Sequence, residues 1–311
     1  MTSRFALTVG PVLYHWPRNR LMQFYADMAD SPADTLVLGE VVCARRRELR
    51  LDDWLALARE LAQTGKRIVL ATQALIETEA DLRLIERQGE QTEFAVEAGD
   101  ASALHLLAGR VPLVLGPHLN IYSRAALVEH ANLGATHWVA PVELALDAIA
   151  AVNPPAQRVT TPAGEPITTE AWAFGRVPLS MSARCFTARH HGLAKDHCGY
   201  KCLADGDGLP MQSSDAQPFL VLNGTQTQSA GVHCLLGDGA ALRQAGVQSL
   251  RLSPCDQGFG QVLRDFDAVM NQGSPAASAA AALQGWPALG VPGPLSNGYA
   301  RHRPGMEWSN A

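Results

Sequence analysis

The sequence predicts an α/β fold, a TIM-barrel-like parallel barrel, and two observations support that prediction. Short apolar runs alternate with helical patterns along the first half of the chain, which is typical of a parallel sheet with helical crossovers. About six such units follow one another, and no glycine-rich nucleotide fingerprint follows the first strand. This succession favours a barrel over an open doubly wound sheet.

The predicted strands are short, apolar and closed by turn residues, as in a buried parallel sheet. Gly39, for example, ends the run at 35–38. Strands are expected at residues 5–9 or 12–14, 35–38, 67–71, 93–96, 112–115, 136–139, 177–181, 219–222 and 247–252.

The helices are predicted from apolar residues spaced three and four apart. Asp52 is expected to cap the second helix, and Gly65 to mark its end. Helices are expected at residues 18–29, 54–63, 79–88, 101–108, 124–133, 143–151, 238–245 and 258–270.

Two segments break this regular alternation. Residues 153–170, rich in Pro, Thr and Ala, predict a loop or an irregular pair of short strands. Residues 272–293, rich in Ala, Gly and Pro, predict loose packing. We therefore expect one barrel-like domain over residues 1–311, with an Ala/Gly/Pro-rich C-terminal segment from about 272 onward.

Composition and charge narrow the class of protein. The 311 residues are 47% hydrophobic and 18% charged, as in an ordinary globular protein, and the net charge of −5 argues against nucleic-acid binding. The one basic cluster, Arg45–Arg47 with Arg50, is expected to be a solvated helix start or a partner contact.

The N-terminal apolar run is interrupted at Gly10–Pro11, no cleavage site follows, and no apolar stretch is long enough to span a bilayer. We expect a cytoplasmic protein whose thiols stay reduced.

Three of the six cysteines, Cys185, Cys198 and Cys202, lie in one short stretch with C-x12-C-x3-C spacing. In an intracellular chain such spacing indicates a metal or a cluster before it indicates a disulfide. Three thiolates make an incomplete site, and Cys43 is the best candidate for the fourth ligand. Cys43 follows one predicted strand, and Cys185 follows the predicted strand that ends at Met181. Because all strands of a parallel barrel end at the same face, we expect these loops to meet there.

Four thiolates suit either a 4Fe–4S cluster or a structural zinc ion. Zinc sites built only from cysteine usually pair their ligands on two tight turns, whereas here only Cys198 and Cys202 are close in sequence. Cations between and beside the cysteines would offset the negative charge of a cluster; they are Arg184, Arg189, Lys195 and Lys201. The residues favour iron–sulfur slightly and leave zinc open.

Other reactive side chains have less specific interpretations. Cys234 and Cys255 are expected to be buried structural thiols. Three histidines near the cysteines are expected to tune the site or lie at the surface: His190, His191 and His197. Four further residues are expected at the strand-end face, as substrate contacts or loop packing: Glu40, His118, Asn120 and Tyr122. No zinc-peptidase helix, nucleophile elbow or credible nucleophile–base pair is found.

Five motifs carry a resemblance to a known family. They are LGEVVCARRR around Cys43, SARCFTARHH around Cys185, KDHCGYKC around Cys198 and Cys202, QPFLVLNGTQTQSA at 217–230, and NGY-x4-PGM at 297–306. Through them the chain resembles the collagenase-like peptidase family, whose mechanism was long unassigned. The resemblance covers essentially the whole chain.

The resemblance implies a site, a reaction and partners. It implies that Cys43, Cys185, Cys198 and Cys202 hold a 4Fe–4S cluster. The motifs are most similar to members that act in oxygen-independent ubiquinone biosynthesis. They imply a heterodimer with the homologous UbiU, hydroxylation of the ubiquinone precursor with prephenate as oxygen donor, and a UbiT-like lipid carrier. A partner-binding scaffold with a structural four-cysteine metal site is the alternative, and a peptidase is less favoured. Catalytic residues stay unassigned.

Overall fold

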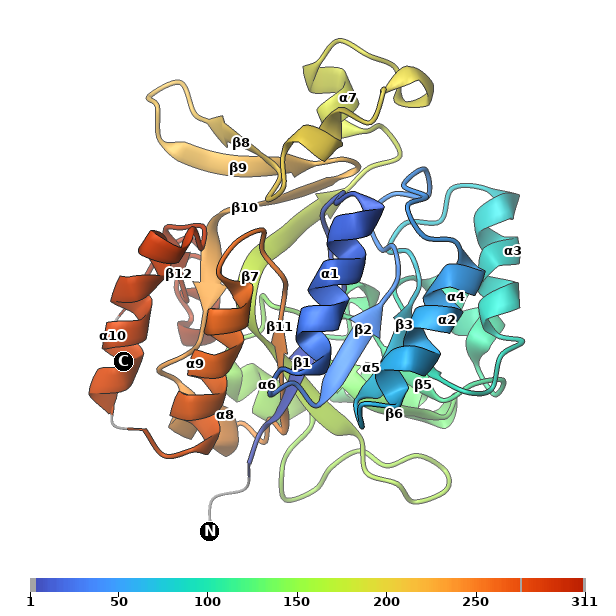
Figure 1. The fold of residues 1–311 in the computed structure, drawn as a ribbon. Helices are drawn as coiled ribbons and strands as arrows, with labels where there is room; N and C mark the ends of the chain where they lie inside the picture. Colours follow the sequence, from blue (N-terminus) through green and yellow to red (C-terminus); the bar gives the residue numbers. More distant parts are fainter. Residues whose placement is uncertain (1–3, 275, 310–311) are drawn as a thin grey trace.

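The computed structural model describes residues 4–274 and 276–309. Within these ranges, eight parallel strands form a closed barrel in the order β11–β1–β2–β3–β4–β5–β6–β7, and β7 pairs with β11 to close it (Figure 1). The strands are β1 (Ala6–Val9), β2 (Thr35–Leu38), β3 (Arg67–Ala71), β4 (Ala95–Ala98), β5 (Leu113–Leu115), β6 (Ala135–Val139), β7 (Thr168–Met181) and β11 (Ser249–Leu252). The predicted α/β barrel is confirmed.

Helices surround the barrel and bury their apolar faces against it (Figure 1). On α9, for example, Phe259, Leu263 and Phe266 are buried. Each such side chain contributes about 1.5–3 kcal/mol when it leaves water. The helices are α1 (Arg18–Ala29), α2 (Leu51–Ala62), α3 (Glu79–Gln88), α4 (Ala101–Leu107), α5 (Arg124–Asn132), α6 (Leu146–Val152), α8 (Gly239–Gln244), α9 (Phe259–Asn271) and α10 (Ala276–Gly285).

The start of α2 differs from the prediction that Asp52 caps it. The helix begins at Leu51, so Asp52 lies inside its first turn. Asp53 instead reaches back, and its Oδ2 accepts a hydrogen bond of 2.8 Å from the backbone N–H of Arg50. A carboxylate in the first turn also faces the positive end of the helix dipole, so either aspartate suits this position and the sequence alone does not rank them.

Strand β7 is longer than the sequence predicted. Residues 168–176 belong to it, whereas the sequence indicated a loop up to 170 and a strand only from 177. Residues 169–177 of the strand are all buried, so this part lacks the alternation that marks a half-exposed strand. Gly175 (φ +123°) also suggests, in the sequence alone, that a strand ends there. A Cβ at Gly175 would lie 2.5 Å from the Cβ of Ser253, so glycine is required for the close approach to the chain after β11.

A large excursion, residues 182–234, leaves the barrel after β7 at the carboxyl end of the strands, where Figure 1 shows it projecting above the barrel. Its last strand returns antiparallel to β7, and the sheet continues in the order β7–β10–β9–β8. Apart from 219–222, these elements were not predicted. They are α7 (Phe186–His190), η2 (Lys195–His197), η3 (Lys201–Ala204), β8 (Leu209–Gln212), β9 (Pro218–Asn223) and β10 (Gln226–Cys234).

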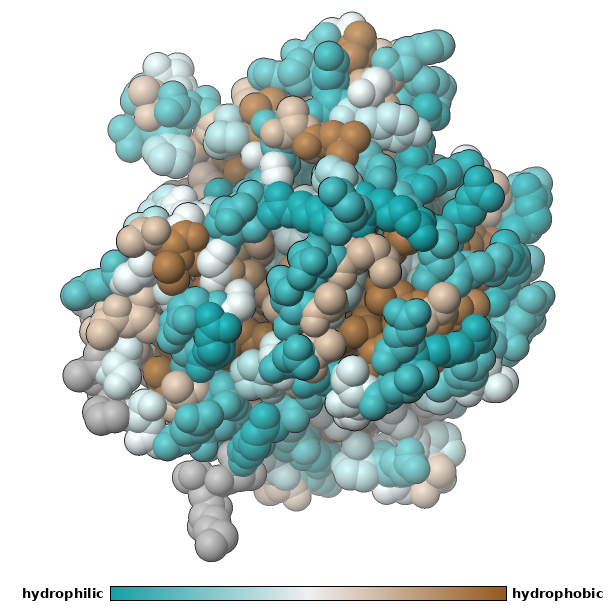
Figure 2. Space-filling view, in the orientation of Figure 1, coloured by the Kyte–Doolittle hydropathy of each residue, from teal (hydrophilic) through white to brown (hydrophobic). Residues whose placement is uncertain are grey.

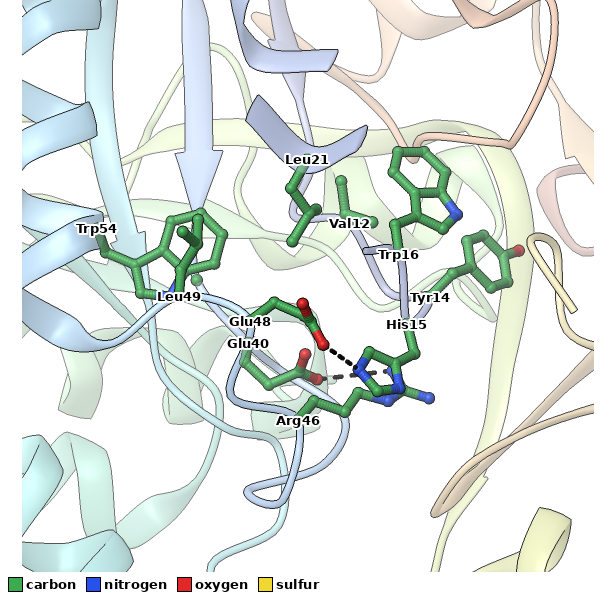
Figure 3. A pocket seen from close by; sticks show the side chains of 11 residues that line it. Val12, Tyr14, His15, Trp16, Leu21, Glu40, Arg46, Glu48, Leu49 and Trp54 are labelled. Carbon is green, nitrogen blue, oxygen red and sulfur yellow. Dashed lines mark hydrogen bonds and ion pairs between the residues drawn. The ribbon is translucent and has the colours of Figure 1, made fainter. Parts of the chain in front are cut away.

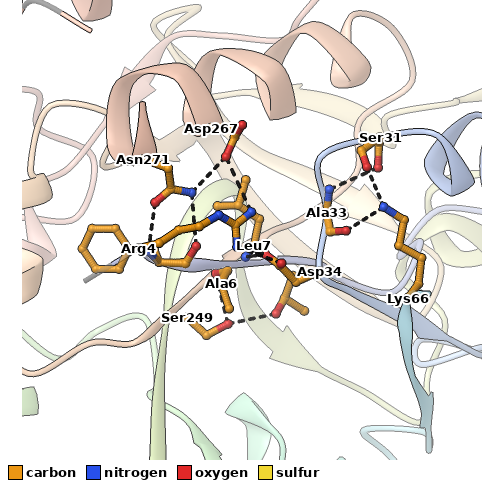
Figure 4. A network of polar contacts seen from close by, with 12 residues as sticks. Arg4, Ala6, Leu7, Ser31, Ala33, Asp34, Lys66, Ser249, Asp267 and Asn271 are labelled. Atoms are coloured by element: carbon orange, nitrogen blue, oxygen red, sulfur yellow. Dashed lines mark hydrogen bonds and ion pairs between the residues drawn. The ribbon is translucent and has the colours of Figure 1, made fainter. Parts of the chain in front are cut away.

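A network of polar contacts stabilises the end of the barrel where the strands begin, opposite the excursion (Figure 4). Asp34, just before β2, accepts 2.7 and 2.8 Å hydrogen bonds from the backbone N–H of Leu7 and the guanidinium of Arg4. Asn271, the last residue of α9, accepts a bond of 2.9 Å from the backbone of Phe5. These contacts tie β1 to β2 and α9, away from the excursion.

The barrel interior holds a buried charge cluster. Arg251 donates to Glu170 (Nε–Oε1 2.6 Å) and to Glu97 (Nη1–Oε1 2.9 Å), and all three side chains are nearly inaccessible to water. Burial opposes ionisation of Glu170, but Arg251, His137 and Thr8 outweigh it and hold its pKa below the usual range. Removing the arginine would leave two unpaired buried carboxylates.

The C-terminal segment is better packed than its composition predicted. Residues 272–293 include α10 and η4 (Trp286–Leu289); residues 275 and 310–311 lie outside the described ranges. Trp286 is 2% exposed, and its Nε1 donates to Asp265 (2.8 Å). The buried indole of Trp286 thus holds the Ala-, Gly- and Pro-rich segment against α9. The chain then adds β12 (Leu295–Ser296) beside β10 and ends its described part after η5 (Tyr299–Arg301).

No helix in the described part of the chain is both long and apolar enough to cross a membrane.

Candidate functional site

Cys43 lies on the loop after β2, where the chain turns sharply at Gly39 (φ +141°). A Cβ at Gly39 would lie 2.7 Å from the carbonyl oxygen of Ala71, so only glycine fits. Glu40 then closes a small loop, because its Oε1 accepts hydrogen bonds from the backbone N–H groups of Val42 (2.9 Å) and Cys43 (3.0 Å). The Cys43 thiol is therefore held in place at the carboxyl end of the barrel, 9% exposed.

The other three cysteines of the predicted site lie in the excursion. Cys185 precedes α7, and its Sγ accepts a hydrogen bond of 3.4 Å from the backbone N–H of Ala188. Cys198 follows η2, and Cys202 lies in η3; the chain between them turns at Gly199 and Tyr200, both with positive φ. Cys185 is buried, whereas Cys198 and Cys202 are partly exposed.

All four cysteines line one hollow between the β2 loop and the excursion. The predicted meeting of Cys43 with the other three is therefore observed in the described residues. The other lining side chains include four cations, Arg45, Arg46, Lys195 and Lys201, and no carboxylate among the residues described. Two of the cations expected from the sequence, Arg184 and Arg189, are not among the lining residues.

Arg46 is the residue whose role the sequence analysis missed. The basic cluster was expected to be solvated, yet Arg46 is 4% exposed and lines the hollow. Its Nη1 donates to the carbonyl oxygen of Leu13 (2.7 Å) and its Nη2 to Oδ1 of Asn223 (2.7 Å), while Glu40 lies 3.6 Å from Nη1. One guanidinium thus joins the β1 loop, the β2 loop and the β9–β10 turn. Its position three residues after Cys43 was the only hint in the sequence.

Two of the three remaining cations are held by carboxylates from outside the hollow. Arg45 Nη1 donates to Asp196 Oδ1 (3.0 Å), and Lys195 Nζ donates to Glu77 Oε2 (2.6 Å). Both pairs join the barrel loops to the excursion. They position the wall that carries Cys198.

Burial and a nearby arginine act on the pKa values of the site thiols in opposite directions. It raises the pKa values of the Cys43, Cys185 and Cys202 thiols above the ordinary value. Arg46 acts in the opposite direction on Cys43 and Cys202, because a nearby positive charge stabilises a thiolate. Such thiols would lose protons when they bind a metal.

A histidine that the sequence analysis did not consider, His15, lies beside Glu48 and Arg46 (Figure 3). His15 Nδ1 is 3.4 Å from Cys202 Sγ, and His15 Nε2 is 3.2 Å from Glu48 Oε1. Burial, and then the charge of Arg46, lowers the pKa of His15. The structure thus brings a thiol within 3.4 Å of an imidazole that contacts a carboxylate, a set of three residues that the sequence did not indicate. By contrast, His190, His191 and His197 do not line the hollow.

Among the residues that the structure describes, no three His, Cys, Asp or Glu side chains are grouped so that they could hold a single metal ion. Four thiols are the soft donors that iron–sulfur clusters use, so the chemistry of the donor set suits such a group.

The four predicted strand-end residues do not share one place. His118 and Asn120 line a second cavity, at the mouth of the barrel, and the Tyr122 hydroxyl donates to Asn120 Oδ1 (3.3 Å) at its exposed edge. Glu40 lines a different pocket, where it lies next to Arg46 (Figure 3). Cys234 and Cys255 are buried and line neither cavity, as the sequence predicted for structural thiols.

The fold and the site define a closed parallel barrel with a four-thiol hollow above its carboxyl end. The model of peptidase family U32 matches residues 20–263, and the chain belongs to that family.

Three solved structures show distant similarity. The U32 peptidase Mk0906 is 8% identical, with 82% of this chain and 95% of that chain covered and a TM-score of 0.43. Phospho-2-dehydro-3-deoxyheptonate aldolase from Thermotoga maritima is 12% identical, with 93% and 72% covered and a TM-score of 0.40. The spore cortex-lytic enzyme SleL of Bacillus megaterium is 10% identical, with 87% and 75% covered and a TM-score of 0.43.

Proposed function

We propose that the chain is a UbiV-like, iron–sulfur subunit of an oxygen-independent hydroxylase in ubiquinone biosynthesis. The observation that carries the proposal is the hollow in which Cys43 meets Cys185, Cys198 and Cys202. Four thiols from two remote parts of a chain, with four cations around them, are what a negatively charged cluster requires. The motifs around these cysteines, which resemble the ubiquinone-related members of the family, point to the same function.

The residues fit a 4Fe–4S cluster by their chemistry. Cys43, Cys185, Cys198 and Cys202 would be its ligands. Arg46 and Lys195 offset negative charge at the hollow and tie its walls together, and His15 can hydrogen-bond to the sulfur of Cys202. When bound, such a cluster supplies electron-transfer chemistry at the carboxyl end of the barrel.

The proposal includes partners and a place of action. The hydroxylase would be a heterodimer with UbiU in the cytoplasm. It would take oxygen from prephenate, and a UbiT-like carrier would present the lipid precursor. Large apolar side chains are exposed on the excursion: Tyr200 (40%), Leu203 (38%) and Phe219 (63%). Figure 2 shows apolar atoms at this projection among hydrophilic ones, as a partner-facing surface would require.

Anaerobic co-expression with UbiU tests this proposal. We expect a brown complex with about four irons and four sulfides per chain and with prephenate-dependent ring hydroxylation. A colourless chain that holds one zinc ion would support the structural scaffold instead. A chain with neither metal nor hydroxylation would contradict both.

A hydrolase is the second candidate, because Cys202, His15 and Glu48 resemble a thiol–imidazole–carboxylate triad and the family carries a peptidase name. Burial argues against it, since it raises the pKa of Cys202 and lowers that of His15, so both are neutral rather than an ion pair. The isolated chain is expected to cleave no peptide. Cleavage that is lost in Cys202→Ser and His15→Gln but kept in Cys43→Ser would establish the hydrolase.

A further inference from the structure

The excursion carries exposed positive charge on a chain that is acidic as a whole. Residues 182–204, which follow β7 and end with η3, contain four Lys and Arg residues and one carboxylate, whereas the whole chain has a net charge of −5. Three of the four cations are exposed, namely Arg184, Arg189 and Lys201. These three side chains are called the basic face below.

The cations of the basic face have no carboxylate partner. Within the part of the chain that the structure describes, the one carboxylate of this segment, Asp196, pairs with Arg45 of the β2 loop (3.0 Å). The fourth cation, Lys195, pairs with Glu77. No ion pair is formed by the three side chains of the basic face in the described residues. The basic face is therefore available to pair with carboxylates of another molecule.

The basic face lies beside the accessible edge of the four-thiol hollow. Of the four cysteines there, only Cys198 and Cys202 are partly exposed, and the other two are buried. Lys201 precedes Cys202 in the chain and lines the hollow, and Arg189 lies on α7, which packs against η3. A molecule held by the basic face would therefore lie next to the partly exposed thiols.

Two apolar side chains complete this surface. Tyr200 and Leu203, on either side of Cys202, are 40% and 38% exposed. Tyr200 has a φ of +53°, a left-handed conformation that is uncommon for a bulky residue, and its ring meets that of His15 edge-on (5.6 Å between ring centres). Aromatic and apolar groups next to cations are typical of a protein interface, whereas a small anion would need the cations alone.

The size of the surface indicates a transient complex. The surface is carried by a helix of five residues, α7, and a 3-10 turn of four, η3. Permanent subunit interfaces commonly bury about 2,000 Å² or more in total, whereas encounters between electron-transfer proteins bury less than about 1,200 Å². Complementary charge steers such brief encounters. A small, basic surface next to thiols thus fits an acidic redox protein.

We propose that the basic face docks an acidic electron-carrier protein, a flavin or iron–sulfur protein whose carboxylates pair with Arg184, Arg189 and Lys201. This inference rests on the proposed function, because an electron carrier requires a redox centre in the hollow. With a cluster bound, the reduced carrier loses one electron, the cluster gains it, and no atom or proton is transferred. Docking depends on the surface alone, so binding and electron transfer can be measured separately.

The binding test uses an acidic flavodoxin as the probe and calorimetry on the anaerobically purified chain, with its partner where the two co-purify. We expect a complex at about 25 mM salt that weakens at least about tenfold at about 300 mM salt, because salt screens exposed charges. Absent or salt-independent binding would overturn the inference. Tighter binding of a single-stranded oligonucleotide than of flavodoxin would assign the basic face to nucleic acid and would overturn it as well.

Charge reversal localises the docking. The double variant Arg184→Glu/Arg189→Glu should weaken flavodoxin binding at least about tenfold, and neither residue lines the hollow. Arg110→Glu is the matched control, because Arg110 is exposed, forms no ion pair within the described residues, and lies between α4 and β5 at the end of the barrel where the strands begin. Equal weakening in the double variant and the control, or in neither, would contradict the proposed surface.

Two further readouts on the same samples separate this inference from the proposed function. Stopped-flow oxidation of reduced flavodoxin should be at least about tenfold faster with the wild type than with the double variant, and equal rates would overturn the assignment to an electron carrier. Iron content is measured in parallel. Docking without iron supports the basic face and contradicts the proposed function, whereas full iron without docking contradicts this inference alone.

Discussion

The guanidinium of Arg46 and the amide of Asn223 share a hydrogen bond of 2.7 Å from Nη2 to Oδ1. Arg46 lies on the loop that carries Cys43, and Asn223 ends β9 next to the turn that receives α7. Through Gly224, whose carbonyl oxygen accepts from the backbone N–H of Phe186 (2.8 Å), the contact reaches the residue after Cys185. This one bond therefore helps to set the position of Cys43 relative to Cys185.

Arg46→Gln should destabilise the folded chain by about 1–3 kcal/mol, because the buried acceptors of Leu13 and Asn223 lose their donor and the half-buried Glu40 loses its cation. The free energy of unfolding in urea measures the loss for the metal-free chain. Iron retention should fall in parallel, since the β2 loop is no longer tied to the excursion. Arg47→Gln, one residue along and exposed, is the control and should change neither quantity. A stable Arg46→Gln chain with full iron would refute the role of Arg46.

Cys43→Ser should abolish cluster binding as thoroughly as Cys198→Ser, because both thiols line the same hollow. Iron and sulfide per chain after anaerobic purification provide the measurement. Cys255→Ala is the control, since Cys255 is buried away from the hollow and its loss should leave the iron content nearly unchanged. A Cys43→Ser chain with wild-type iron would remove the basis of the proposed centre.

Gly224→Ala should cost more stability than Gly109→Ala, although both glycines have positive φ, +65° and +72°. A Cβ at Gly224 would lie 2.7 Å from Arg46 Nη2, whereas one at Gly109 would contact nothing within 4 Å. Each change carries a backbone cost of about 1 kcal/mol, and the first adds displacement of a buried arginine. Thermal unfolding of the two variants gives the comparison, and equal losses would contradict it.

Asp207→Asn should stabilise the chain at pH 7.5 by on the order of 1–3 kcal/mol. Burial raises the pKa of Asp207 to about 6, so between pH 4 and 6 the folded chain binds more protons there than the unfolded chain does. The contribution of this carboxyl to stability therefore falls as pH rises through that window and is flat above it. Unfolding free energies of the two proteins from pH 4 to 8 should diverge across the window.

The matched control for this pH dependence is Asp52→Asn, whose side chain is 84% exposed. It measures the effect of removing one negative charge from an exposed position. A difference between Asp207→Asn and the wild type that stays constant with pH would show that burial does not govern the ionisation of Asp207.

Local pattern was enough to predict the barrel. Helix Arg18–Ala29 and strand Arg67–Ala71 have the predicted bounds, because apolar spacing and nearby turn residues mark them. Strand β7 was largely missed, since a strand buried on both faces lacks alternation and Gly175 looks like a break.

The sequence predicted the part of the site that depends on the order and direction of the strands. Strand direction brings Cys43 and Cys185 to one end of the barrel. The contacts of Arg46 and His15 depend on tertiary packing, which local spacing does not encode. Arg46 in particular looks solvated in sequence because three arginines stand together, and only its partners Leu13 and Asn223 explain its burial.

Strand β7 lines the cavity at the barrel mouth through Trp172 and its last four residues, and Cys185 follows four residues after the strand ends. The same strand therefore forms part of the wall of that cavity and leads directly into the cysteine excursion. A substitution in β7 can for this reason alter the cavity and the position of the first excursion thiol together.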